Sequence, residues 1–229
     1  EARPVDEGLD GSDRLGFAVH KERHGVAHGP RVLSHPQSHH VPEVYDAISA
    51  GVPPDNVFEF MELASKASIG GVTDLNTAVD GITSTINAFG AENITATQAS
   101  DLMFTSVKLG KTTMEELSKS LFQVNPVAAG LGIEFGNVTA SLAALTAQGV
   151  PTRVAATQVR SALVELGKEG TIASDTFRDL SGKTFTDFIA GGGDMKGAFD
   201  LMKKGADDMG VGVGDLFGSV EAGMSVIAL

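Results

Sequence analysis

The stretch TATQASDLMFTSVKLGKTTMEELSKSLF, residues 95–122, decides the fold class because it contains two complete helix signatures in succession. Each half opens on a capping-box pair, Thr95 with Gln98 and then Thr113 with Glu116, which can satisfy the free N–H groups of a first helical turn. Apolar residues follow at helical spacing in both halves, at Ala99, Leu102, Met103 and Val107 and at Met114, Leu117, Leu121 and Phe122. The stretch therefore predicts two helices that meet near Gly110.

Glycines extend this pattern through the rest of the chain after residue 40. Nine of them stand about 20 residues apart, at Gly51, Gly71, Gly90, Gly110, Gly130, Gly149, Gly170, Gly191 and Gly210. Because glycine has no Cβ, it takes the left-handed conformation at the end of a helix at little cost. Further helical faces fall at 159–166 and 195–209, and strict strand-type alternation is absent. The predicted fold class is all-α, an array of about nine short helices punctuated by glycine.

Polar residues near these glycines are predicted to begin helices. Asp55, Thr73, Thr152 and Asp215 have side chains that can accept a hydrogen bond from a first-turn N–H group, so each is a predicted N-cap. Alanines crowd the faces of the predicted helices, and such small faces bury little area per residue. One helical hairpin alone would therefore be marginal, and the hairpins are expected to stack on one another or on other chains.

The first forty residues differ in character from the rest. All six histidines of the chain lie there, together with five glycines and three prolines, and no apolar periodicity survives. We predict two parts, a His-rich, irregular and disordered arm at 1–40 and a helical domain at 41–229. His20, His24 and His28 have the spacing of a helical metal site, but Gly25 and the Gly29–Pro30 pair disfavour a helix. A non-native or mis-framed start is an alternative to a native arm.

Composition excludes several classes of protein. The chain has 229 residues, a formal net charge of −12 and no cysteine, which excludes disulfide scaffolds, thiolate metal sites and cysteine nucleophiles. The acidic balance argues against a nucleic-acid surface, because phosphate contacts need clustered Lys and Arg. No run of about 18 apolar residues predicts a transmembrane segment.

Candidate chemical groups after residue 40 are few. The run Gly110-Lys111-Thr112 resembles part of a phosphate-binding loop, but the upstream glycine is missing and a helix precedes it. The acidic pairs Glu115–Glu116 and Asp207–Asp208 are interpreted as solvated helix faces, the second of them paired with lysines one turn earlier. The sequence thus predicts no catalytic, cofactor-binding or metal-ligating residue, and no enzyme.

Several blocks of the chain together resemble the core region of phage tail tape measure proteins. The most specific is VKLGKTTMEELSKSL at 107–121, followed in order by VNPVAAGLGI at 124–133 and SLAALTAQGVPTRVAATQVRSAL at 141–163. Upstream, YDAISAGVP at 45–53 and GGVTDLNTAVDGITSTINAFG at 70–90 are similar to the same region. Downstream, residues 197–229 look like its continuation. The resemblance covers roughly 41–229 and leaves out the first forty residues.

The resemblance implies a structural role in tail assembly and tail length determination inside the tail tube. It implies as partners other tape measure chains, tail tube and tail tip proteins and tail assembly chaperones, with the virion tail and, during assembly, the host cytoplasm as locations. A continuous helix of 189 residues would reach only about 280 Å, and glycine stops forbid one, so we expect the core domain without the ruler proper.

Two alternatives remain open from the residues alone. The first is a helical interaction module that docks partner helices through the face carrying Met195, Met202 and Met209, since methionine surfaces adapt to many partners. The second is a metal-responsive protein that uses the histidine arm.

Overall fold

The computed structural model describes residues 41–229, and within that range every regular element is a helix. This confirms the all-α prediction, whereas the predicted arm at 1–40 and its histidines lie outside the described residues. The α-helices are α1 (Val41–Ser49), α2 (Val57–Gly71), α3 (Leu75–Phe89), α4 (Ala96–Leu109), α5 (Met114–Leu121), α6 (Asn125–Gly130), α7 (Phe135–Ala147), α8 (Thr152–Gly167), α9 (Ile172–Ser181), α10 (Phe185–Ala190), α11 (Met195–Met209) and α12 (Val220–Ala228). Two 3-10 turns join them, η2 (Pro54–Asn56) and η3 (Val213–Leu216).

Within this range, twelve α-helices replace the nine predicted because some glycine intervals contain more than one helix. The interval that ends at Gly130 holds both α5 and α6, and the interval that ends at Gly191 holds α9 and α10. The first pair is joined by a short break in the helical hydrogen bonding rather than by a left-handed glycine. The second pair is divided at Gly182, which is left-handed with φ 70°.

The capping predictions are partly confirmed. Thr95 and Gln98 form the predicted capping box, and the Thr113 hydroxyl accepts a hydrogen bond from the Glu116 N–H group. The other four predicted N-caps are wrong: Asp55 lies inside η2, Asp215 lies inside η3, Thr152 is the first residue of α8, and Asp74 replaces Thr73. The capping side chains that the sequence analysis missed are Asp74, Thr171, Thr184, Asp194 and Ser219.

The nine glycines have two different roles. The prediction of a left-handed conformation agrees with a positive φ at Gly51, Gly149, Gly170 and Gly210, whereas Gly90, with φ 88° and ψ 136°, lies outside the left-handed helical region. It is wrong at Gly71, Gly110, Gly130 and Gly191, where φ is not positive. After α2 the left-handed residue is Val72, with φ 51°, because Gly71 is needed one position earlier. A Cβ on Gly71 would lie 2.7 Å from the Cβ atom of Met114, so this glycine permits the close approach of two helices.

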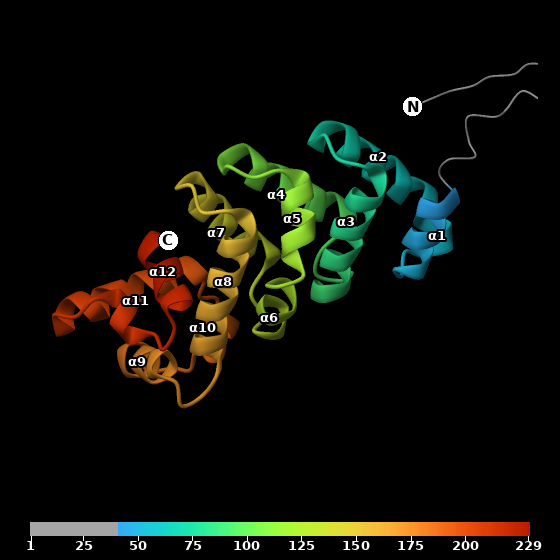
Figure 1. Cartoon of the computed structure of the whole chain (residues 1–229). Coiled ribbons are helices and arrows are strands. Elements are labelled where there is room, and N and C mark those ends of the chain that lie inside the picture. The colour runs from blue at the N-terminus through green and yellow to red at the C-terminus, as the bar shows by residue number, and fades with distance from the viewer. Residues whose placement is uncertain (1–40) are drawn as a thin grey trace, which may run out of the picture. The chain divides into compact units, whose positions relative to one another are not determined.

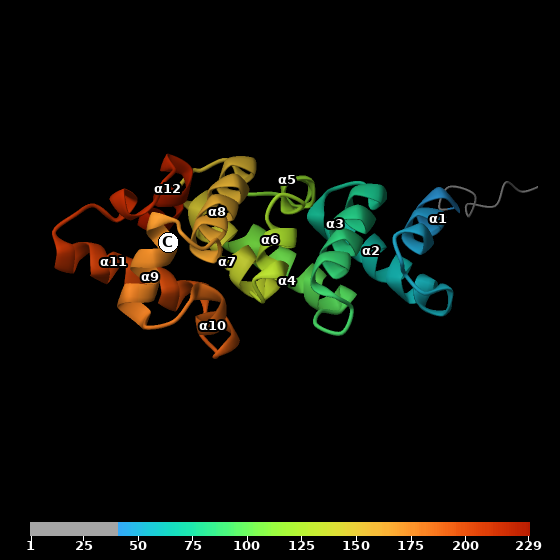
Figure 2. The same ribbon diagram turned by 90° about the horizontal axis from the view of Figure 1, so that it is seen from below.

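The helices pack mainly on near neighbours in the sequence and bury one continuous apolar core (Figure 1). The first helices, α1 to α3, pack together, α4 packs on α7, and α8 is covered by α7, α5 and α12. In both views the helices from α1 to α8 broadly follow their order in the chain, and α12 returns to pack on α8 (Figure 2). Most residues of the predicted faces are buried in this core, Leu102 and Val107 are partly buried against it, and Phe122 and Met209 are 65% and 51% exposed.

A 60-residue repeat underlies this order. The helices α3, α7 and α11 begin 60 residues apart, at Leu75, Phe135 and Met195, each preceded by an acidic N-cap residue. Their buried positions coincide, as at Ile82, Leu142 and Met202. Two long helices and two short ones follow in the same order in α3–α6 and α7–α10, and α6 and α10 also begin 60 residues apart. Units of this kind bury their faces by stacking on the next unit.

Candidate interaction surfaces

Reactive groups do not converge within residues 41–229. No group of three or more His, Cys, Asp or Glu in this range is placed to hold a metal ion. Across the same range, no helix is both long enough and apolar enough to cross a bilayer.

The Gly110-Lys111-Thr112 run is a packing turn between helices. Its threonine is buried, and the Thr112 hydroxyl lies 2.7 Å from the Thr152 hydroxyl at the start of α8. A Cβ on Gly110 would overlap Thr146 Oγ1 and lie 3.0 Å from the Cα atom of Ala143, both on α7. These contacts account for the glycine and the threonine without a phosphate, while Lys111 is exposed.

The acidic pairs lie on exposed helix surface, as predicted. Glu115 forms an ion pair with Lys119 at 2.5 Å, and the Glu116 carboxylate accepts a hydrogen bond of 3.0 Å from the Thr152 hydroxyl. The predicted pairing of Asp207 and Asp208 with lysines is wrong for the described residues, since the α11 ion pair joins Lys196 to Asp200 instead. Neither pair has the geometry of an acid–base site.

The methionine face of α11 is part of the core. Met195 and Met202 are 2% and 0% exposed, and only Met209 reaches the surface. A partner helix could not reach the first two without displacing the helices that cover them. The alternative of docking through this face is therefore wrong, because the stripe is already occupied within the chain.

One carboxylate ties two distant segments together. The Glu165 side chain on α8 accepts hydrogen bonds from the Gly218 N–H at 2.6 Å, the Ser219 N–H at 3.0 Å and the Ser219 hydroxyl at 2.5 Å. A carboxylate at the start of α12 also suits the positive end of that helix dipole. No local sequence signal marks this contact, which spans more than fifty residues.

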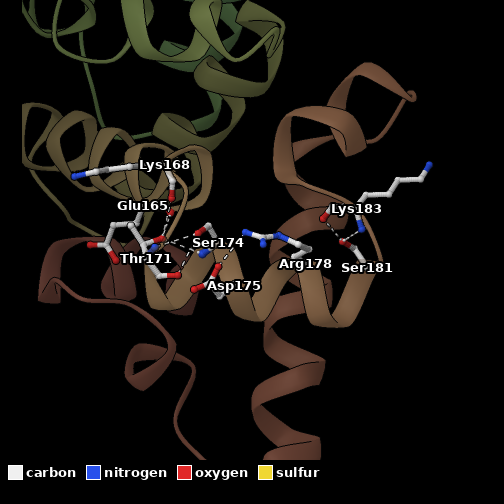
Figure 3. Close-up of polar contacts among 8 residues, drawn as sticks. All are labelled: Glu165, Lys168, Thr171, Ser174, Asp175, Arg178, Ser181 and Lys183. Carbon is white, nitrogen blue, oxygen red and sulfur yellow. Dashed lines mark hydrogen bonds and ion pairs between the residues drawn. The ribbon is translucent and has the colours of Figure 1, made fainter.

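The same residue stands beside a chain of polar contacts that begins α9 (Figure 3). The Thr171 hydroxyl donates to the carbonyl oxygen of Glu165 and forms a capping box with Ser174. Further along α9, Asp175 and Arg178 form an ion pair at 2.9 Å. In Figure 3 the contacts of Thr171 and Ser174 therefore fix the turn from α8 to α9, and those between Ser181 and Lys183 fix the turn from α9 to α10.

Three interhelical turns form one edge of the array, which we call the turn edge. It comprises the turns α2–α3, α4–α5 and α7–α8, which lie along one side of the ribbon in Figure 1. Gly71 abuts Met114, and Thr112 bonds to Thr152, so each turn contacts the next. At its far end, the Gln148 side chain donates to the carbonyl oxygen of Ala228 on α12 at 2.7 Å.

The turn edge exposes apolar and charged side chains together, and its charges include the carboxylates of Asp74 and Glu116. Ile69, Val72 and Leu109 are 80%, 90% and 64% exposed. The exposed basic residues of the edge are Lys108, Lys111 and Arg153, and none of them forms an ion pair with another residue of 41–229. The edge therefore carries charges of both signs, on a domain whose net charge is −11, with 12 basic and 23 acidic residues in 41–229.

A groove of about 820 Å³ lies at the opposite ends of the same helices. It is lined by the end of α3, the first turns of α4 and α7, and the end of α6. Phe89 and Phe135 form its aromatic wall, with ring centroids 5.4 Å apart. Its charged lining residues are Asp101 and Glu134, and no basic residue lines it. We call it the acidic groove.

A second groove of about 670 Å³ lies between α2, α3 and the α3–α4 turn. Its charged lining residues are Glu59, Glu62 and Lys66, of which the last two form an exposed ion pair at 2.7 Å. The Asn87 side chain closes one side by donating to the carbonyl oxygen of Ala50 at 2.7 Å. With its charges largely balanced, this groove has no clear preference for a charged partner.

The perturbed carboxyl groups are all at the surface and have local causes. Hydrogen bonds from the Thr77 hydroxyl and N–H group lower the pKa of Asp74 at the start of α3. Lys66 lowers the pKa of Glu62, and Lys196 lowers the pKa of Asp200. Each of these groups is stabilised in its charged form, which suits caps and ion pairs and gives no general acid or base.

Comparison with known proteins places the chain among phage tail proteins. Residues 43–218 match the model of a family described as phage-related minor tail protein. A curated relative named probable tape measure protein, from Clostridium phage phiCD119, is 34% identical over 196 residues. The alignment covers 81% of this chain and 21% of that relative, so the chain spans about a fifth of the relative's length. No solved structure matches.

The family match covers nearly the same residues as the resemblance described in the sequence analysis. It runs through the α4–α5 turn, the turn edge and the acidic groove, and it leaves out the first forty residues. The resemblance to phage tail tape measure proteins is confirmed, and the chain belongs to the phage-related minor tail protein family.

Proposed function

We propose that this chain is the folded core region of a tape measure protein that acts in tail assembly and tail length determination inside the tail tube. Its role is structural rather than enzymatic. The observation that carries this proposal is the family match over residues 43–218, which coincides with a helical array in which the described reactive groups serve as caps, ties and ion pairs.

The proposed partners are other copies of the chain, tail tube and tail tip proteins, and tail assembly chaperones. The proposed locations are the virion tail and, during assembly, the host cytoplasm. We further propose that residues 41–229 act as one domain, with 1–40 as a separate arm. The acidic balance of the helical part supports a protein–protein role rather than contact with the phage genome.

The helical part does not act as a ruler by its own extension. Its longest helix, α8, has 16 residues and so spans about 24 Å. Packed helices of this size cover far less length than an extended chain of the same residue number. Length determination is thus a property proposed for a longer protein, in which this domain supplies folding and assembly contacts.

The proposal is tested in a phage that encodes this chain. Deleting the codons for 41–229 in frame is expected to leave few or no tails of normal length by electron microscopy. Duplicating the same codons is expected to lengthen tails by much less than the about 280 Å that a continuous helix of 189 residues would add. Normal tails after the deletion would refute the structural role, and a full extension after the duplication would refute the packed arrangement.

A further inference from the structure

We propose that the helical array opens at one boundary, between α1–α3 and the helices α4–α12, while α4–α12 stay folded. The boundary lies where α3 packs on α5 and α6. We call this contact the polar joint, and it comprises Gly81 and Thr85 on α3, Ser118 on α5 and Asn125 at the start of α6. Such an opening is a property of the chain itself and goes beyond the proposed role in the tail.

Few polar contacts hold this boundary closed. Between residues 41–89 and 96–229 a single side-chain hydrogen bond is formed, from Asn125 Nδ2 to the Thr85 hydroxyl at 3.2 Å. None of the ion pairs within 41–229 crosses the boundary. On its far side, α5 is tied to α8, because the Thr152 hydroxyl donates to the Glu116 carboxylate at 3.0 Å. When the polar joint opens, α5 therefore stays with α8 and separates from α3.

The polar joint also buries polar atoms that have no partner. Ser118 and Asn125 are both buried, and neither the Ser118 hydroxyl oxygen nor Asn125 Oδ1 forms a hydrogen bond within 41–229. A polar atom that leaves water without gaining a partner destabilises the closed state. The contact between α4 and α7 is different, because the buried Ser106 hydroxyl there donates to the carbonyl oxygen of Thr139 at 3.0 Å. The array is therefore weaker at the polar joint than between α4 and α7.

The helix on the near side of the joint depends on its packing. Gly81 lies in the middle of α3, where glycine disfavours a helix, and a Cβ at this position would overlap the Ser118 hydroxyl oxygen. The Thr83 and Thr85 hydroxyls donate to the carbonyl oxygens of Val79 and Gly81 one turn earlier, a bond that weakens a helix slightly. Because a 15-residue helix of this kind is marginal alone, α3 is expected to unfold once it leaves α5.

Opening exposes apolar side chains that the closed array buries. Met103 and Met114 are both buried, and each meets a glycine across the boundary. Met103 Cε lies 3.3 Å from the position of a Cβ on Gly81, and the Cβ atom of Met114 lies 2.7 Å from that of a Cβ on Gly71. Methionine side chains are flexible and adapt to surfaces of different shape. The open form thus presents an adaptable apolar surface that the closed form lacks.

Native-state amide hydrogen exchange of the whole 229-residue chain, at low urea concentrations, tests the opening. Amides of α2 and α3 are expected to exchange through a shared opening, on the order of tenfold faster than amides of α7 and α8, which are released only when the whole array unfolds. A single common opening from α2 to α8 would overturn the proposal, because the array would then have no weak boundary.

Two serine variants form a matched pair, because both serines are buried in helices and differ in their hydrogen bonding. Ser118→Ala removes an unpaired hydroxyl and is expected to slow exchange in α3 on the order of tenfold. Ser106→Ala removes a bond to Thr139, so it is expected to speed exchange in α4 and α7 and to leave α3 unchanged. If Ser118→Ala leaves exchange in α3 unchanged or makes it faster, the proposal is wrong.

Thr85→Val tests the same joint in the opposite direction. The variant keeps the shape of the side chain and removes the hydroxyl to which Asn125 donates. Exchange in α3 is expected to become faster on the order of tenfold, while exchange in α8 stays as it is. Far-UV circular dichroism checks that each variant remains helical. Equal acceleration in α3 and α8 would mean that the array opens as one unit, and the polar joint would then have no separate role.

Discussion

Two glycines that look equivalent in the sequence are expected to respond in opposite ways to the same substitution. Gly110 and Gly130 each follow a predicted helix, and the glycine pattern predicts a left-handed conformation at both. In the structure neither is left-handed, and their surroundings differ. Gly110→Ala and Gly130→Ala therefore form a matched pair that separates close packing from backbone conformation.

The magnitudes follow from the space around each Cβ position. At Gly110 the added carbon would overlap Thr146 Oγ1 and lie 3.0 Å from the backbone of Ala143, so α4 and α7 must separate. Overpacking of this kind costs about 1–3 kcal/mol. At Gly130 no atom lies within 4 Å, and the residue ends α6 with a helical conformation. Alanine there should stabilise the fold by about 0.4–1 kcal/mol, because the unfolded chain loses freedom.

Urea unfolding followed by circular dichroism measures both variants. The free energies of unfolding of the two variants should differ by roughly 1.5–4 kcal/mol, and each 1 kcal/mol shifts the melting temperature by about 2–4 °C in a domain of this size. Equal effects at the two positions would refute the assignment of Gly110 as a packing glycine. A strongly destabilising Gly130→Ala would mean that α6 ends differently.

Three other substitutions test single contacts. Glu165→Gln should cost about 1.5–3 kcal/mol by weakening the hydrogen bonds to the start of α12, and faster amide exchange in 219–229 than in α8 would show that α12 is released. Asp74→Asn should destabilise the fold at neutral pH and change its stability little at acidic pH. The Asp74 pKa is lowered from 3.8 in the folded state, so the charged carboxylate contributes stability above pH 3.8, and this contribution is lost as the pH falls through the lowered pKa. Urea titrations of both proteins at several pH values would detect the difference. Val72→Gly should raise stability by up to about 1 kcal/mol in thermal melts, because relief of the left-handed strain outweighs the added freedom of the unfolded chain, and a loss of stability would refute the strain.

The local part of the fold could be predicted from the sequence. In residues 95–122 the caps and apolar faces depend on neighbours three or four positions away, and the structure confirms them except at Phe122. The role of Gly110 could not be predicted in this way, because it depends on Ala143 and Thr146 in another helix. The tie from Glu165 to Ser219 was missed for the same reason.

The 60-residue repeat escaped the sequence analysis for a different reason. Its equivalent positions share burial but not identity, as Ile82, Leu142 and Met202 show. A packed core accepts several apolar side chains of similar volume at one position. Equivalent positions of the repeat can therefore stay buried while their residue types differ. The predicted 20-residue glycine interval is one part of this 60-residue unit.

The repeat also shows where differences in function can arise. Positions buried in each unit are constrained by stacking, which explains why Ile82, Leu142 and Met202 all lie inside. Exposed positions carry no such constraint, so the charges there are free to differ between units. The α4–α5 turn carries Lys108 and Lys111 shortly before Glu115 and Glu116, whereas the corresponding α8–α9 turn carries Lys168 directly before Glu169. The charges at equivalent turns therefore do not follow from the stacking of the helices, which fixes only the buried positions.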